Sequence, residues 1–439
     1  MNGHKVLVVI ILIAIMVLSW VNYFVFGINK GNSQYNETIS EAKDDYQRGL
    51  YQLCAEKYEE TLKYKDTKDT RDKILISYAD LYKQDEKAYS DYLSAAKSAV
   101  ASYPTDTSYL DKVADLYIEK GKYTEAYTYL KNAIDADMKD GSIYKKYLEV
   151  KYSNKLTSQE YPDFIRCSDS RFLVSDESVW KIIDEKGFAV TNSAFSYLSP
   201  PNSDGMMMYV DEAGARLIDK DGVVQGIFSK SLESAGLCSE NLIAICENGN
   251  YSYYSIRGDK LFGAYEEAGT FTNGLAAVKA GGKWGIIDSK GNYVINPKYE
   301  DVKLDDQGEY ICNSVIIAKE NSQYQLYDSK WNAVKGFSCD NMDIPTKDGI
   351  IAFMSDGKWG FVDTKGKVVI EPQYDKAKSF SNGLAAVCKD GLWGFIDREG
   401  NIALAYQYLD ADYFSLKGGC MVRTSPECWK LLMRNITDN

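Results

Sequence analysis

A motif led by tryptophan and glycine, repeated at a nearly constant spacing, most constrains the fold of this chain. Its clearest copies are KWGIIDSKG at 283–291, KWGFVDTKG at 358–366 and LWGFIDREG at 392–400. Weaker copies in the same phase place eight anchor positions at 180, 215, 251, 284, 324, 359, 393 and 429. A period of this length is typical of repeated supersecondary units that bury their apolar faces against one another. Residues 161–439 are therefore predicted to form one β-repeat domain.

Each unit is predicted to contain three short strands, as in LAAVKA, KWGIID and NYVINP. The turn after the second strand has the pattern D-x-x-G, in which Asp bonds to backbone N–H groups and Gly takes a positive φ. The tryptophans are predicted to lie in the core because an indole buries a large area, with ligand stacking as the alternative. A glycine after the tryptophan permits close backbone approach. The structural anchors are Trp180, Trp284, Gly285, Trp359, Gly360, Trp393, Gly394 and Trp429.

These motifs resemble the WG (KWG) repeat family, an all-β repeat found mostly in bacterial proteins. The resemblance implies a structural or interaction role and carries no catalytic motif. Eight units are compatible with a propeller-like ring or with a curved open solenoid. The chain ends soon after the last anchor, so the last unit lacks its third strand. A ring, the favoured form, therefore requires strand exchange between the ends of the domain.

Residues 38–153 show a helical pattern with a period near 35 residues. In the clearest unit, Leu110, Val113 and Ala114 share one helix face, Gly121 breaks the helix, and a second apolar helix face follows. This arrangement resembles the tetratricopeptide (TPR) repeat. We predict TPR-like helical repeats over 38–153, preceded by a linker at 28–37 and followed by a linker at 154–160.

The TPR resemblance implies a groove, lined by the first helix of each pair, that binds peptides or partner proteins. The candidate partner contacts on this lining are Asp80, Asp111, Asp115 and Glu119. An acidic groove favours a basic partner segment. The alternative is an ordinary solvated helix face.

The N-terminal segment is strongly apolar, with no charge between Lys5 and Lys30. A helix over 6–27 is long enough to cross the roughly 30 Å hydrocarbon core of a bilayer, and a buried core helix is the alternative. We predict a transmembrane helix at 6–27 with a short inner tail at 1–5. Lys5 before the segment and acidic residues after it favour an inside N-terminus and an extracytoplasmic bulk.

Composition excludes several classes of function. The only histidine is His4, so neither folded domain offers a histidine base or zinc ligand. The net charge of -12 disfavours nucleic acid as a partner. The nine cysteines contain no C-x-x-C pair. Buried free thiols are the favoured prediction for them, and disulfide bonds are the alternative. No metal site is predicted, because the recurring Asp residues suit turns better than a calcium array.

Taken together, the sequence predicts a non-enzymatic, membrane-anchored scaffold at a bacterial cell envelope. It would bind protein partners through its TPR-like and WG-repeat surfaces, without a cofactor. The alternative is an envelope carbohydrate-binding protein or hydrolase that uses surface carboxylates and aromatic side chains.

Overall fold

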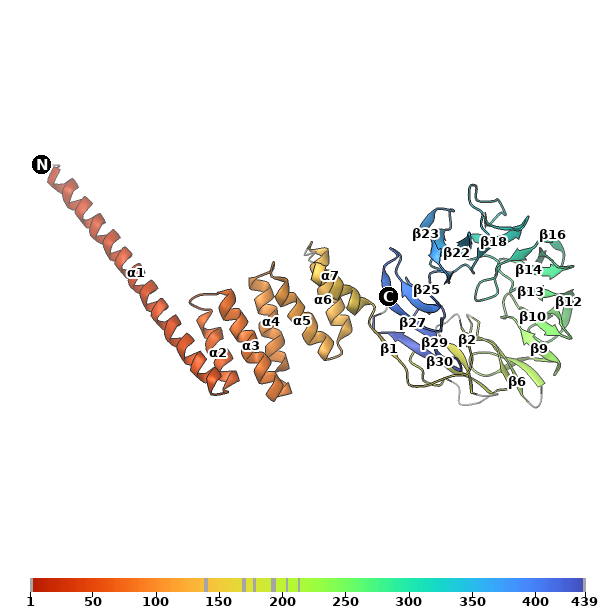
Figure 1. The fold of residues 1–439 in the computed structure, drawn as a ribbon, viewed down its shortest axis with the longest axis horizontal. Helices are drawn as coiled ribbons and strands as arrows, with labels where there is room; N and C mark the ends of the chain where they lie inside the picture. The colour runs from red at the N-terminus through yellow and green to blue at the C-terminus, as the bar shows by residue number, and fades with distance from the viewer. Residues whose placement is uncertain are drawn as a thin grey trace. The chain divides into compact units, whose positions relative to one another are not determined.

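The computed structural model describes residues 3–137, 141–167, 171–176, 179–190, 195–202, 204–211 and 214–436. The chain divides into two compact units, Met1–Val150 and Lys151–Asn439. The first unit is helical and the second is built from β-sheets (Figure 1). The helices of the first unit are α1 (Gly3–Gln47), α2 (Tyr51–Thr61), α3 (Lys68–Gln84), the 3-10 helix η1 (Glu86–Ala88), α4 (Tyr89–Ser102), α5 (Thr107–Glu119), α6 (Tyr123–Asp135) and α7 (Gly141–Lys151).

Short turns join consecutive helices of the first unit into stacked pairs (Figure 1). Gly49 and Gly121 end α1 and α5 with φ values of 76° and 68°, a left-handed conformation that glycine adopts without steric cost. Thr67 caps the start of α3 by accepting a hydrogen bond from the Thr70 backbone N–H. The local sequence therefore decides where the helices begin and end.

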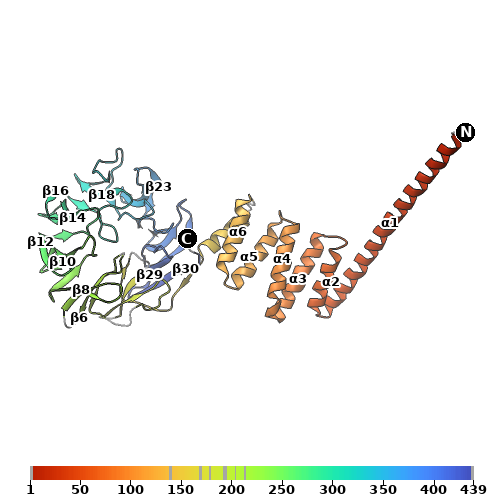
Figure 2. The ribbon, with the colours of Figure 1, turned by 180° about the vertical axis from the view of Figure 1, so that it is seen from behind.

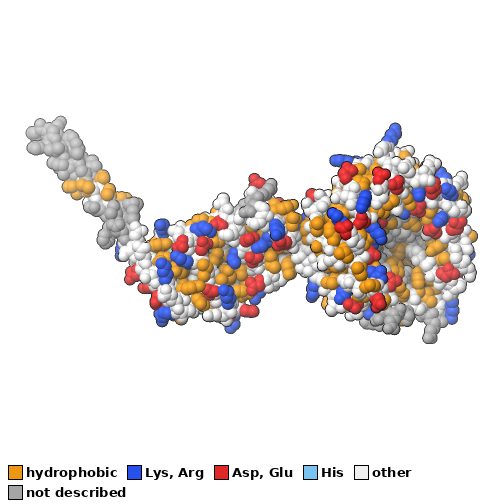
Figure 3. Space-filling model, in the orientation of Figure 1, with side chains coloured by type: hydrophobic (Ala, Val, Ile, Leu, Met, Phe, Trp, Pro, Cys, Tyr) orange, Lys and Arg blue, Asp and Glu red, His pale blue; other side chains and the backbone are white. Residues whose placement is uncertain are grey.

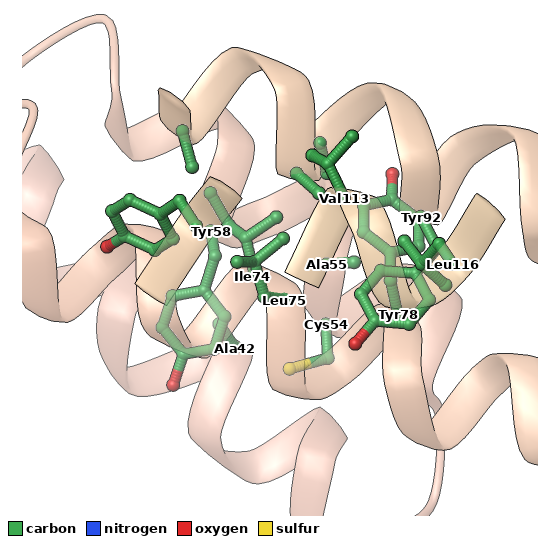
Figure 4. Packing of buried hydrophobic residues seen from close by; sticks show 14 residues of the cluster. Ala42, Cys54, Ala55, Tyr58, Ile74, Leu75, Tyr78, Tyr92, Val113 and Leu116 are labelled. Atoms are coloured by element: carbon green, nitrogen blue, oxygen red, sulfur yellow. The ribbon is translucent and has the colours of Figure 1, made fainter. Parts of the chain in front are cut away.

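Small side chains alternate with tyrosines in the core between these helices. Ala42, Cys54 and Ala55 are fully buried, and they allow neighbouring helix backbones to lie close together. Tyr58 and Tyr78 fill the remaining space, as Figure 4 shows. The predicted N-terminal helical region is thus present, and it includes residues 30–37 of the segment predicted as a linker.

The prediction of a membrane anchor is wrong. Across the part of the chain that the structure describes, no helix has both the length and the apolar character needed to cross a bilayer. Residues 6–27 lie in α1, and the side chains of 3–14 and 22–29 are outside the described residues. The single-pass localisation is contradicted by the same finding.

The second unit contains eight antiparallel sheets arranged as the blades of a closed propeller (Figures 1 and 2). The first three blades consist of β2 (Phe164–Arg166), β3 (Phe172–Asp176) and β4 (Val179–Ile183); β5 (Tyr197–Leu198), β6 (Met207–Asp211), β7 (Gly214–Ile218) and β8 (Val224–Phe228); and β9 (Leu232–Ala235), β10 (Leu242–Glu247), β11 (Asn250–Ser255) and β12 (Lys260–Tyr265).

Blades 4 to 6 follow in chain order. They consist of β13 (Glu267–Ala268), β14 (Leu275–Ala280), β15 (Lys283–Asp288) and β16 (Tyr293–Tyr299); β17 (Asp301–Val302), β18 (Val315–Glu320) and β19 (Gln323–Asp328); and β20 (Asn341–Met342), β21 (Ile350–Ser355), β22 (Lys358–Asp363) and β23 (Val368–Tyr374).

Blade 7 contains β24 (Lys376–Ala377), β25 (Ala385–Lys389), β26 (Leu392–Ile396) and β27 (Ile402–Tyr408). Blade 8 contains β28 (Asp410–Ala411), β29 (Gly419–Ser425), β30 (Cys428–Arg434) and β1 (Asn154–Leu156). Most blades therefore have a short additional strand before the three that the sequence predicted. This strand forms one edge of its sheet, and the strand after the Trp-led strand forms the opposite edge. The latter, seen for example in β12 and β16, lies at the rim of the ring (Figure 1).

The two ends of the propeller unit meet in blade 8. Strand β1 pairs antiparallel with β30, with Asn154 opposite Arg434 and Leu156 opposite Leu432. Tyr161 and Trp429 then exchange two backbone hydrogen bonds of 2.9 and 2.8 Å. The segment 154–161, which contains the predicted linker, thus supplies the strand that the C-terminal end lacks. The correct fold class is an N-terminal helical region followed by an eight-bladed β-propeller, without the predicted transmembrane helix or an open solenoid.

Candidate functional site

A groove of about 340 Å³ lies within the helical unit, between α1, α2 and α3. Residues three or four apart share one helix face, so α1 and α3 each present a continuous row of side chains to the groove. The lining consists of Lys43, Tyr46 and Gln47 from α1, Tyr58 from α2, and Lys73, Ile76 and Ser77 from α3.

The lining of the groove contains both apolar and basic side chains. Tyr58 is 3% exposed and belongs to the core shown in Figure 4, whereas Ile76 is 50% exposed. Lys73 Nζ lies 6.0 Å from the centre of the Tyr58 ring and 2.5 Å from Asp69 Oδ2. Lys43 is exposed, and no carboxylate among the described residues lies within 4.0 Å of its amine. The groove therefore combines an exposed aliphatic side chain with two lysines.

Asp80, one of the predicted partner contacts, lies beside this groove. Tyr46 donates its hydroxyl hydrogen to Asp80 Oδ2 over 2.5 Å, and this bond raises the pKa of Tyr46 to about 12. Lys83 Nζ donates to the other carboxylate oxygen over 2.8 Å. The bonds from Lys83 and Tyr46 lower the pKa of Asp80. The carboxylate is thus held by the protein's own groups.

The other predicted acidic contacts lie on α5. Lys146 of α7 joins two of them, with Nζ 3.1 Å from Asp111 Oδ1 and 2.8 Å from Asp115 Oδ1. Glu119 is exposed at the end of the same helix. Figure 3 shows acidic and basic side chains interspersed over the visible face of this unit. The structure therefore brings Asp111 and Asp115 together on a lysine, apart from Asp80.

The predicted tryptophan anchors lie on equivalent strands and face a recurrent partner across the sheet. Trp284, Trp359 and Trp393 stand opposite Tyr299, Tyr374 and Tyr408 on the rim strand of the same blade. Trp429 stands opposite Tyr161 and Trp180 opposite Phe195. Trp284 and Trp393 are buried, and Trp180, Trp359 and Trp429 are half-buried.

The glycine after each of three tryptophans lies against the neighbouring rim strand. A Cβ atom on Gly285 would lie 2.6 Å from the Ile295 carbonyl oxygen. The corresponding distances are 2.6 Å for Gly360 and 2.7 Å for Gly394. The strand register shifts at the same point in all three blades. A side chain at these positions would push the rim strand away.

The recurring aspartates of the D-x-x-G turns act on the backbone. Asp288 Oδ1 accepts hydrogen bonds of 2.9 Å from the N–H groups of Lys290 and Asn292. The same pair of bonds recurs at Asp184, Asp219, Asp363 and Asp397. Over the described ranges, no three His, Cys, Asp or Glu side chains are grouped as a metal site would require.

Sequence reasoning missed a second set of carboxylates, which cap the hairpin turn between the two middle strands of a blade. Glu266 accepts the Gly282 N–H with both carboxylate oxygens at 3.1 Å. Glu233, Glu300, Asp340 and Asp375 make the corresponding bond in other blades. The sequence signal was a Tyr followed by an acid, as at 265–266, 299–300 and 374–375.

An ionic network joins five blades near the propeller axis. The Arg166 guanidinium lies 3.2 Å from Asp306 and 3.5 Å from Asp412, and stacks 4.5 Å from the Tyr413 ring centre. Lys378 Nζ lies 3.1 Å from Asp412, and the Tyr413 hydroxyl donates to Asp343. Because these charges pair with one another, the network holds the blades together.

A small cavity of about 40 Å³ lies beside this network. Asp305 lines it, and burial raises the pKa of this carboxyl to about 7 even though two backbone N–H groups bond to Oδ1. Burial also raises the pKa of the Cys312 thiol to about 12. All nine cysteines are free, and eight of them are buried.

The sequence model of a family described as WG containing repeat matches residues 263–284, 284–321, 359–393 and 393–421. These segments are WG repeats. Their boundaries fall on Trp284, Trp359 and Trp393, so a WG repeat runs from the Trp-led strand of one blade toward that of the next. The TPR resemblance of the helical unit is not confirmed.

The solved structures that are similar to this chain include the following two. One is titled "KlHsv2 with loop 6CD replaced by a Gly-Ser linker", with 12% identity and a TM-score of 0.39 over 56% of this chain and 93% of that chain. The other is the AfRom2 CNH domain, with 10% identity and a TM-score of 0.31 over 56% of this chain and 95% of that chain. No curated protein matches the sequence.

Proposed function

We propose that this protein is a binding scaffold whose TPR-like helical unit and WG-repeat propeller present surfaces to protein partners. The observation that carries the proposal is the groove between α1 and α3, which leaves Ile76 half exposed beside two lysines. Concave sites with an apolar floor and a few polar groups are where proteins usually bind ligands. Binding a partner segment there would remove the Ile76 side chain from water.

The propeller supports the same role in a different way. Its tryptophans pack against the rim strands, and its recurring aspartates bond to turn backbones. These residues build a rigid frame, which leaves the loops at the two faces as surfaces for recognition. A basic partner segment stays a prediction for the exposed Asp115 and Glu119 of the helical unit.

Site-specific photocrosslinking in the full chain tests the proposal. A photoreactive amino acid at Gln47, which lines the groove, should crosslink to a protein partner in cells. The control position is Glu60, an exposed residue of α2 outside the lining. Mass spectrometry should find one recurrent partner from Gln47 and not from Glu60. Equal crosslinking from both positions, or none from Gln47, would contradict a groove that binds partners.

A further inference from the structure

We infer that the groove between α1 and α3 recognises an acidic peptide segment that carries an apolar side chain. The inference rests on the proposed function and deepens it by naming the chemistry of the partner. The sequence alone suggested a basic partner, because the residues expected to line the groove were acidic. The groove that the helices form is lined by lysines instead, so the partner inferred here is acidic.

The charge of the lining is entirely positive. Lys43 and Lys73 both line the groove, and no carboxylate does. The lining is therefore positively charged, although the chain as a whole has more acidic than basic side chains, 63 against 51. The nearest predicted acid, Asp80, is already bonded to Tyr46 and Lys83. A partner carboxylate would therefore meet two amines without an opposing acidic residue on the lining.

One lysine already has a carboxylate neighbour, which a partner would have to displace. Lys73 pairs with Asp69 over 2.5 Å, and the Asp69 side chain is 69% exposed. Exposed pairs four residues apart on a helix contribute little to stability. A partner carboxylate held on both lysines can replace Asp69, which then returns to water.

The floor requires an apolar side chain from the partner. Ile76 lines the groove and is 50% exposed, so an entering aliphatic or aromatic group meets its apolar surface. The volume of about 340 Å³ is near the lower end of ligand pockets, which span about 300–1,000 Å³. A groove of this size suits one or two side chains of a peptide and not the surface of a folded domain.

The test measures fluorescence anisotropy of three labelled peptides with the full chain at low ionic strength. The peptide EELFEE combines acids with an apolar centre, KKLFKK reverses the charge, and EESSEE removes the apolar centre. EELFEE should bind at least about tenfold more tightly than either of the others, because charge and burial both contribute. Added salt should weaken its binding, since exposed charge pairs are screened.

Matched variants locate the binding to the groove. Lys43→Glu and Lys73→Glu should each weaken EELFEE binding about tenfold by placing a like charge beside the peptide. The control Lys63→Glu changes a lysine that is 73% exposed and outside the lining. Ile76→Ser should weaken binding, whereas Leu53→Ser, an exposed apolar residue of α2, should not. Circular dichroism checks that each variant keeps its helices.

The inference would be overturned by KKLFKK binding as tightly as EELFEE, or by Lys63→Glu weakening binding as much as Lys43→Glu. A crosslinked partner at Gln47 together with no binding of EELFEE would also overturn it, while the proposed function would stand. The two proposals therefore fail separately.

Discussion

At the residue scale, the repeat is most informative where one copy departs from the others. Trp331 occupies the turn position that glycine holds in the D-x-x-G copies, and its φ is 63°. A left-handed backbone costs an L-residue about 1–2 kcal/mol. The indole stacks 4.9 Å from the Tyr299 ring and 6.0 Å from the Tyr310 ring. Aromatic packing offsets the strained turn of this copy.

Two substitutions at Trp331 separate these effects. Trp331→Ala should lower the free energy of unfolding by about 2–4 kcal/mol, because it removes the half-buried indole and keeps the unfavourable φ. Trp331→Gly should lose about 1 kcal/mol less, since glycine accepts a positive φ. Urea unfolding of both variants measures the difference. An alanine variant more stable than the glycine variant would contradict this account.

Asp305 predicts how stability depends on pH. Its folded pKa of about 7 lies above the ordinary value of 3.8, so the folded state holds its proton more tightly than the unfolded state. The contribution to stability is therefore greatest below about pH 4 and is lost as the pH rises through about 7. Asp305→Asn keeps an oxygen for the Gln307 and Glu309 N–H groups and removes the titration. The gain in stability from Asp305→Asn should thus be larger at pH 8 than at pH 4.

Thermal unfolding of both proteins across this pH range checks the sign. Asp163→Asn is the matched control, because Asp163 also bonds to backbone and does not line this cavity. A gain from Asp305→Asn that is the same at pH 4 and pH 8 would show that folding does not raise the pKa of Asp305.

At the scale of the element, the sequence predicted the three longer strands of a unit and the turn after the Trp-led strand. Strands and Asp–Gly turns of this kind are specified by residues only a few positions apart, so the local sequence is enough to predict them. The short first strand of most blades was not predicted, because a segment of two residues such as Glu267–Ala268 is too short to show a periodic pattern. The capping carboxylates were not predicted because each bonds to a turn that lies 15 to 22 residues later in the sequence.

The hairpin caps predict a local effect. Glu266→Ala should remove the bonds to the Gly282 N–H and speed hydrogen exchange of that amide, at a cost of about 1 kcal/mol in stability. Glu267→Ala is the matched control, because its carboxylate pairs with Lys279 instead. Residue-resolved hydrogen exchange measures both variants. An unchanged rate at Gly282 in Glu266→Ala would exclude the capping role.

At the scale of the whole molecule, the propeller depends on segments that are far apart in the sequence. Strand β1 pairs with β30, and Arg166 of blade 1 pairs with acids of blades 5 and 8. The positions of the repeat anchors in the sequence indicated that the last unit lacked a strand. It did not show which segment would replace it, because three-residue β1 is too short to carry a pattern.

The closing strand predicts a global change in stability. Thr157→Pro should remove the N–H that donates to the Leu431 carbonyl over 2.9 Å, and should lower the melting temperature of the propeller as one transition. Thr157→Val is the matched control. Its buried hydroxyl has no hydrogen-bond partner among the described residues, so valine should be neutral or slightly stabilising. Calorimetry of the two variants measures this, and an unchanged melting temperature in Thr157→Pro would show that β1 does not close the ring.

The sequence by itself determined the repeat period, the phase of the Trp and Tyr positions and the helical character of the first unit. These features follow from residue spacings within single units. Only the tertiary structure decided that eight units close into a ring, and that Lys43 and Lys73 line one groove whose lining includes no carboxylate. Both results depend on contacts between segments separated by tens to hundreds of residues. The membrane prediction drawn from the apolar N-terminal pattern was wrong, because no helix among the described residues is long and apolar enough to cross a bilayer.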